Sequence, residues 1–192
     1  MKGIVSAVLV AFILTSPDLP AQSRSFVENQ ITKWQGEIAR NPKDYETLAA
    51  IGSAYGKLGD NATAVTYFKK AIAVNPSYAD AYLGLGTSYG FLKQPNEAYT
   101  ALKKAVTLAP ANPYARGKLG TTLGKAGRYQ EAIIELKQAV KLKPDLAEAH
   151  FALGLAYISV GDERQAVAEV NMLSKIDPEL AGQLQGYVNQ GK

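Results

Sequence analysis

Apolar positions beyond residue 24 recur at intervals of three and four residues, the spacing of one face of an α-helix. Leu48, Ile51 and Tyr55 form one such stripe, and Ala64 and Phe68 begin a second stripe after a glycine-containing turn. Each helix is polar on its opposite side, and its apolar stripe stays exposed to water unless another helix covers it. The pattern therefore predicts pairs of amphipathic helices that pack against each other.

The helix pair recurs with a 34-residue period. Two sets of residues mark the period, one of glycines and one of prolines: Gly52, Gly86, Gly120 and Gly154, and Pro42, Pro76, Pro110, Pro144 and Pro178. Each proline ends a helix because it lacks the N–H that would continue the hydrogen-bond ladder. The sequence therefore predicts four repeats, residues 45–78, 79–112, 113–146 and 147–180, stacked around one continuous core.

These markers resemble the tetratricopeptide repeat family, in which an aromatic residue or Leu, Leu-Gly, Tyr, Ala, an aromatic residue, Ala and Pro follow one another. The second unit reads Tyr82, Leu85-Gly86, Tyr89, Ala98, Leu102, Ala105 and Pro110. The resemblance implies an all-α fold, a right-handed α-solenoid of four tandem helix-turn-helix repeats with flanking cap helices. Arg116 and Leu123 depart from the usual aromatic residues, and Leu173 from a small one, which we expect to alter only local packing.

The ends of a repeat stack need caps, because an open end exposes an apolar face. In residues 24–44, Val27, Ile31, Trp34 and Ile38 share a helical face, so we expect a lone cap helix over 25–41 that resembles the second half of a repeat. Residues 181–192 predict a short solvating helix, weakened by two internal glycines.

Residues 1–23 are typical of an export signal. The apolar run over 3–15 would reach roughly 20 Å as a helix, short of the roughly 30 Å hydrocarbon core of a bilayer. Ala21-Gln22-Ser23 supplies the small residues of a cleavage site before Arg24. We expect an exported protein, periplasmic or secreted. The alternative is an uncleaved membrane anchor formed by residues 3–15.

The composition argues against enzymatic catalysis and against a metal site. The 192 residues include no Cys and one His, which excludes thiolate sites and multi-histidine metal centres. The family resemblance implies that His150 occupies a position where a large side chain packs between the two helices of a unit, so a structural role is favoured over a catalytic one. The net charge of +4 does not by itself indicate nucleic acid. We expect no enzyme activity, no catalytic residue, no cofactor and no metal.

The family resemblance implies that the first helices of the repeats line a concave groove that binds a protein partner. The residues expected to face it are Ala49, Ser53, Gly56 and Lys57, then Leu83, Thr87, Gly90 and Phe91, then Gly117, Lys118, Thr121 and Lys125, and finally Phe151, Leu155 and Ile158. Hydroxyl groups, a cationic spot and an apolar strip would suit an extended or helical segment with an acidic residue and hydrophobic anchors.

The sequence thus predicts an exported scaffold or adaptor that binds a partner peptide or helix, with a role in assembling envelope complexes. The alternative is a structural protein that forms homo-oligomers. Seven basic and three acidic side chains give residues 113–146 a net charge of +4, and two basic and six acidic ones give residues 147–180 a net charge of −4. This asymmetry could steer weak head-to-tail association. Ordinary surface patterning is the favoured interpretation, because much of the acidity (Asp162, Glu163, Asp177 and Glu179) falls in predicted turns.

Overall fold

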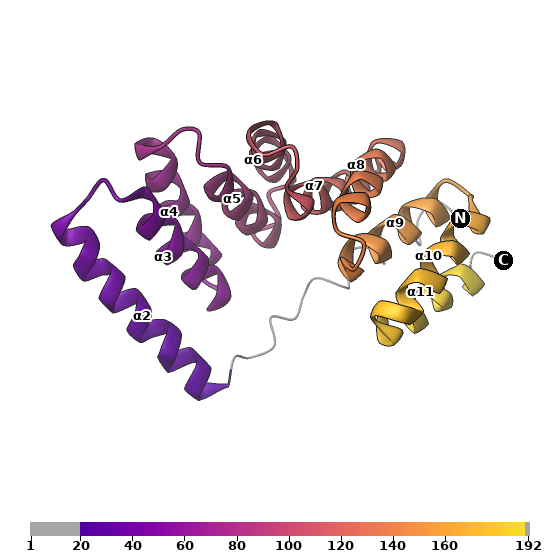
Figure 1. Cartoon of the computed structure of the whole chain (residues 1–192), viewed down its shortest axis with the longest axis horizontal. Coiled ribbons are helices and arrows are strands. Elements are labelled where there is room, and N and C mark those ends of the chain that lie inside the picture. The colour runs from indigo at the N-terminus through magenta and orange to yellow at the C-terminus, as the bar shows by residue number, and fades with distance from the viewer. Residues whose placement is uncertain (1–19, 191–192) are drawn as a thin grey trace. The chain divides into compact units, whose positions relative to one another are not determined.

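A computed structural model describes residues 20–190, which are helical throughout apart from short turns and contain no strand (Figure 1). The first helices of the four repeats are α3 (Tyr45–Lys57), α5 (Ala79–Phe91), α7 (Pro113–Lys125) and α9 (Ala147–Ser159). The second helices are α4 (Asn61–Val74), α6 (Pro95–Leu108), α8 (Tyr129–Leu142) and α10 (Glu163–Ile176). The all-helical fold and its paired helices are as predicted. The expected leader over 1–23 lies outside the described residues up to residue 19.

The chain divides into two compact units, whose described parts are residues 20–109 and 110–190. In the first, α3 packs with α4, α5 packs with α6, and α4 also contacts α5. In the second, α7 packs with α8 and α9 with α10, while α9 also contacts both α7 and α8. Each unit therefore has its own core, built from the same helix-turn-helix pair.

Side-chain caps start several of these helices. The Asp44 carboxylate accepts a hydrogen bond from the Thr47 backbone N–H at 3.0 Å, and Asp60 accepts one from Thr63 at the same distance. Such caps satisfy N–H groups that the first turn of a helix leaves unpaired. Between paired helices, Gly59, Gly127 and Gly161 have φ between +76° and +85°, the left-handed conformation that reverses the chain at little cost to glycine.

The glycines of the 34-residue period allow close helix packing. A Cβ on Gly86 or on Gly120 would lie 2.6 Å from Leu102 Cγ or Leu136 Cγ, and one on Gly52 would lie 3.1 Å from the Phe68 ring. In each of these three repeats a large side chain of the second helix thus packs directly on the glycine of the first. Gly154 instead receives Leu184, from the last helix of the chain.

Two further helices flank the repeats. Before them, α2 (Ala21–Arg40) begins four residues earlier than the expected cap helix, and it packs against α3. After them, α11 (Pro178–Gln190) begins three residues before the expected tail helix and packs against α10 and α9. The proposed cleavage point before Arg24 falls in the first turn of α2. Within residues 20–190, no helix is both long enough and apolar enough to cross a bilayer.

Candidate functional site

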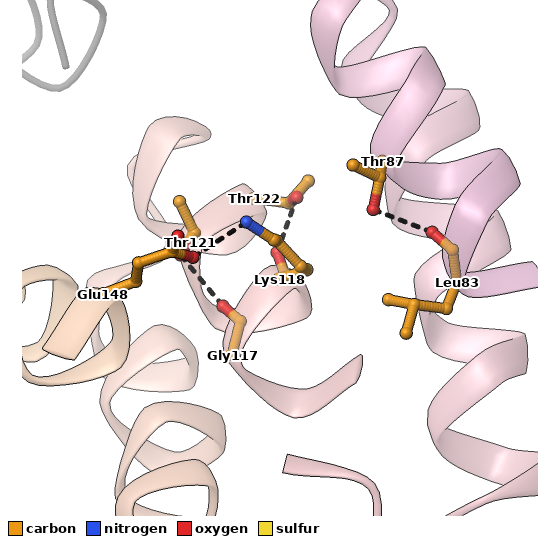
Figure 2. Close-up of polar contacts among 7 residues, drawn as sticks. All are labelled: Leu83, Thr87, Gly117, Lys118, Thr121, Thr122 and Glu148. Carbon is orange, nitrogen blue, oxygen red and sulfur yellow. Dashed lines mark hydrogen bonds and ion pairs between the residues drawn. The ribbon is translucent and has the colours of Figure 1, made fainter. Parts of the chain in front are cut away.

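Helix α7 carries the most distinctive charged surface among the predicted site residues. Its sequence contains Arg116, Lys118 and Lys125 and no acidic residue. Lys118 and Lys125 are two helical turns apart, so both lie on one face. Lys118 Nζ lies 3.0 Å from Glu148 Oε2 on the neighbouring α9, an ion pair that Figure 2 shows crossing between the two helices.

This ion pair is open to solvent, because 44% of the Lys118 side chain and 72% of the Glu148 side chain are exposed. An exposed pair of this kind contributes at most about 1 kcal/mol, so a partner's carboxylate could replace Glu148 at little cost. Desolvation and repulsion from Lys118 both lower the pKa of Lys125 below that of a free lysine. A carboxylate beside Lys125 would oppose the effect of the repulsion from Lys118 on that pKa.

The two threonine hydroxyl groups predicted to line the site are hydrogen bonded within their own helices. Thr121 Oγ1 donates to the Gly117 carbonyl at 2.9 Å, and Thr87 Oγ1 donates to the Leu83 carbonyl at 2.8 Å (Figure 2). The hydroxyl protons are therefore used internally, while the oxygen lone pairs stay available to accept hydrogen bonds. The threonines can offer a partner acceptors rather than donors.

The predicted apolar end of the site is largely covered. Phe151 and Leu155 of α9 are each 4% exposed, and Ile158 is half-buried. The Phe151 ring packs edge-on against Tyr187 of α11, with ring centroids 6.3 Å apart. Phe151 and Leu155 are therefore too buried to offer an apolar strip to a partner, and Tyr187 of α11 covers Phe151. For Ile158 the prediction remains untested.

The remaining predicted residues lie mainly in the unit of residues 20–109. In α3, Ala49 is buried, Gly56 is half-buried, and Ser53 and Lys57 are exposed and line a groove between α3 and α2. In α5 the four predicted residues range from half-buried to exposed: Leu83, Thr87, Gly90 and Phe91. Gly117 of α7, in the other unit, is buried against side chains of α8 and α9 and of the turn between them.

In each of the last two repeats, a cationic side chain is hydrogen bonded to both a proline carbonyl and a carboxylate. The sequence analysis did not predict this feature. Arg116 donates from Nε to the Pro110 carbonyl and from a terminal nitrogen to Glu135, both at 2.7 Å. One period later, His150 Nε2 lies 2.9 Å from the Pro144 carbonyl, and Nδ1 lies 2.6 Å from Glu169 Oε2. We call each set a cation–carboxylate clasp.

The clasp of the last repeat favours a charged histidine. A carbonyl oxygen only accepts, so Nε2 must carry a hydrogen, and a carboxylate facing Nδ1 is best met by a second one. The hydrogen bond to Glu169 is the main reason why the pKa of His150 is raised, against the opposing effect of burial. His150 is 4% exposed and fully hydrogen bonded, as its predicted packing role requires. The 34-residue spacing of Glu135 and Glu169 was the signal that could have revealed both clasps.

Among residues 20–190, no three His, Asp or Glu side chains gather closely enough to hold a metal ion. The recurring pairs of helices define a helical repeat fold. A family model described as "TPR repeat" matches residues 41–90 and 122–161, and one described as "Tetratricopeptide repeat" matches residues 79–112. These matches together span more than half of the chain. The chain belongs to the tetratricopeptide repeat family, whose fold is a protein-interaction scaffold.

Solved structures of other repeat proteins share this fold. A crystal structure of MamA is 24% identical, with a TM-score of 0.72, covering 84% of this chain and 94% of that one. YrrB, described as a TPR protein with an unusual peptide-binding site, is 22% identical, with a TM-score of 0.69 and 86% of both chains covered. A thermophilic TPR protein of Thermus thermophilus is 21% identical, with a TM-score of 0.69, covering 98% of this chain and 99% of that one. No curated protein sequence matches.

Proposed function

We propose that this protein is an adaptor that binds an acidic segment of another protein across α7 and α9. The observation that carries the proposal is the pair Lys118 and Lys125, which share one face of a helix without acidic residues. Glu148 is a counter-charge for Lys118, and no described residue forms an ion pair with Lys125. A carboxylate of the partner segment could pair with Lys125 directly. It could also displace the exposed Glu148 from Lys118.

The partner segment that fits this surface has an acidic residue near Lys125 and a hydrophobic side chain that contacts Ile158. The threonines of α7 would accept hydrogen bonds from its N–H groups, because their own protons are already used. The fold that the chain shares with YrrB, a protein with a peptide-binding site, is consistent with this use. Binding alone accounts for these features, so we propose no catalytic step and no cofactor.

The test is photo-crosslinking in cells from position 121, with a photoreactive residue in place of Thr121. The matched control places the same residue at Thr100, an exposed threonine of α6 whose hydroxyl also donates to its own helix. We expect a discrete protein adduct from position 121 and none from position 100. Adducts of equal intensity from both positions would contradict the proposal.

Charge reversal tests the same surface. Lys118→Glu with Lys125→Glu should reduce the adduct at least tenfold while leaving helical circular dichroism and Tm unchanged. Lys103→Glu with Lys104→Glu, on the exposed surface of α6, makes the same change in net charge and should have no effect. If both double variants weaken the adduct equally, net charge rather than this site attracts the partner.

We also propose that the protein is exported by residues 1–23 and acts in the cell envelope, in the periplasm or after secretion, as part of the assembly of a larger complex. The support is the sequence pattern alone: an apolar run over 3–15 followed by small residues at 21 and 23. Amino-terminal sequencing of the protein from its host should begin at Arg24. A chain that begins at Met1 and sediments with membranes would favour the alternative, a retained anchor.

A further inference from the structure

A cavity of about 410 Å³ lies between α8 and the turn that joins α9 to α10, within the unit of residues 110–190. We call it the α8–α10 cavity. Helix α8 contributes Gln130, Ile133 and Lys137, which are three and four residues apart and therefore share one helical face. The opposite wall comes from the end of α9 and the start of α10: Tyr157, Val160, Asp162 and Gln165. The lining atoms are mainly polar, which favours a polar ligand.

Tyr157 brings an unpaired hydroxyl group to this cavity. The residue is only 7% exposed, yet no group within residues 20–190 is hydrogen bonded to its hydroxyl. The hydroxyl must reach water through the cavity, because no fully enclosed side-chain oxygen or nitrogen in that range lacks a partner. Burial, together with the charges of Glu169 and Asp162, raises the pKa of Tyr157, so the phenol stays protonated and can donate. Polar groups on deeply buried side chains are usually paired, so the unpaired hydroxyl points to a ligand.

Lys137 and Asp162 line opposite walls of the cavity and do not form an ion pair with each other. Among the described residues, no carboxylate forms an ion pair with Lys137. Asp162 accepts a hydrogen bond from the Gln165 backbone N–H through Oδ1 at 3.1 Å, which leaves Oδ2 available. The cavity therefore offers a cation and a carboxylate that do not neutralise each other. This arrangement is complementary to a ligand that itself carries both charges.

The corresponding lysine and tyrosine contact each other in the unit of residues 20–109. Two periods earlier, Lys69 of α4 lies over the ring of Tyr89, with Nζ 5.7 Å from the ring centroid. Within residues 110–190, no such contact joins Lys137 to Tyr157, although both stand in the same register and line the cavity. Asp162 adds a carboxylate where the earlier repeat has a neutral side chain. The lysine, the tyrosine and the carboxylate are thus available to a ligand only at the later position.

We infer that the α8–α10 cavity binds a free amino acid with a polar, uncharged side chain. The carboxylate of the ligand would pair with Lys137 and accept a hydrogen bond from the Tyr157 hydroxyl, while its ammonium group would pair with Asp162. The amides of Gln130 and Gln165 can each donate and accept hydrogen bonds, which suits a neutral polar side chain. An internal segment of a protein carries neither of the two backbone charges, so the cavity favours a free amino acid over such a segment.

Titration of the full chain with L-serine, L-asparagine and L-glutamine, followed by isothermal calorimetry, tests the inference. At least one of the three should bind saturably at a single site. For the amino acid that binds most tightly, the analogues that lack its ammonium group or its carboxylate should each bind about tenfold more weakly or worse, because each loses one charge-assisted contact. The absence of saturable binding by all three overturns the inference. So does equally tight binding of both single-charge analogues.

Side-chain variants test whether the amino acid binds in the cavity. Lys137→Met and Asp162→Asn should each weaken binding by about tenfold, and Tyr157→Phe by about fivefold. Tm should change little, because asparagine can still cap α10 and phenylalanine keeps the ring. Lys69→Met and Tyr89→Phe make two of these changes at the corresponding positions of α4 and α5, and they should leave binding unchanged. Full binding by all three cavity variants, or equal weakening by the controls, overturns the inference.

A second comparison separates this site from the adaptor surface. Lys118→Glu with Lys125→Glu should leave amino-acid binding unchanged, because neither lysine lines the cavity. Lys137→Met should likewise leave the crosslink from position 121 unchanged. The amino-acid site therefore stands or falls independently of the adaptor function. Loss of amino-acid binding in the Lys118→Glu with Lys125→Glu variant, with binding retained in Lys137→Met, would place the ligand on the adaptor surface and overturn the inference.

Discussion

Lys93 shows how one residue departs from an otherwise regular set of turns. Gly59, Gly127 and Gly161 have positive φ, and Lys93, in the same 34-residue register, has φ +58°. A side chain in this left-handed region costs roughly 1–2 kcal/mol, because Cβ approaches the following carbonyl oxygen. The fold keeps the turn conformation and leaves the strain at that lysine.

Replacing Lys93 with glycine should therefore stabilise the protein. Relief of the strain exceeds the extra entropy of glycine in the unfolded chain, so we expect a gain of about 0.5–1 kcal/mol in the free energy of unfolding, measured by urea denaturation. Lys93→Asn removes the same charge and should gain less, since asparagine tolerates this conformation better than lysine but not as well as glycine. Equal gains from both variants would indicate that removal of the lysine charge, not relief of strain, is responsible.

The sequence could predict the period, the helix pairs and the residues that repeat with them. The helices pack so closely at Gly52, Gly86 and Gly120 that glycine is required there, and it therefore recurs in the sequence. It could not show that Phe151 is covered, because its contact with Tyr187 depends on the path of α11, which begins at Pro178. Nor did it show that Arg116, an apparent departure from the family pattern, fills the same role as His150. Equivalent contacts made by different residue types are visible only once the atoms are placed.

At the scale of the helix pair, glycine sets the distance between the two helices. Gly120 of α7 and Gly90 of α5 are both helical glycines, yet their surroundings differ. A Cβ at Gly120 would approach Leu136 Cγ to 2.6 Å and the Ala132 carbonyl oxygen to 3.2 Å, whereas one at Gly90 would meet no atom within 4 Å. The backbone contact cannot be relieved by a change of rotamer, so α7 and α8 would have to separate.

Alanine at these two positions should change stability in opposite directions. Gly120→Ala should lower the free energy of unfolding by about 1–3 kcal/mol through overpacking. Gly90→Ala should raise it by up to about 1 kcal/mol, the difference in helix propensity. Thermal and urea unfolding of both variants measures the contrast. A loss of stability in Gly90→Ala would show that its open surroundings do not govern its effect.

The clasp of the last repeat should make stability depend on pH. The pKa of His150 is higher in the folded state than the value of about 6.5 for an unfolded histidine. The contribution of the clasp is therefore complete below about pH 6.5, as long as Glu169 is ionised, and is lost as pH rises through the folded-state pKa of His150. Tm should fall with rising pH in that range. His150→Arg should remove this dependence, because arginine stays charged as Arg116 does. An unchanged profile in His150→Arg would assign the dependence to another group.

At the scale of the whole molecule, the two compact units give the chain two sets of core contacts. The unit of residues 20–109 contains a core cluster around Leu48, Phe68 and Leu85. The unit of residues 110–190 buries Leu136, Leu153 and Leu184 completely. Repeat proteins are stabilised mainly by contacts between sequence neighbours, so damage to one unit should remain local.

Breaking one clasp tests this independence. Glu169→Gln removes the charge that faces the buried His150, and loss of one member of a buried pair costs about 3 kcal/mol. Hydrogen exchange followed by mass spectrometry should show faster exchange in α9, α10 and α11 and unchanged protection in α3 and α4. Faster exchange throughout residues 20–190 would instead show that the two units open together.

The clasps also define where one exchangeable module of the chain ends and the next begins. Each clasp joins a proline carbonyl to a cation six residues later and a carboxylate nineteen residues beyond that: Pro110, Arg116 and Glu135, then Pro144, His150 and Glu169. A cut between the proline and its cation would separate the donor from its acceptor, whereas a cut just before the proline keeps all three together. Residues 110–143 and 144–177 are therefore the segments that a duplication, deletion or graft can move intact. The boundary between Ala109 and Pro110, where the chain divides into its two compact units, coincides with such a cut.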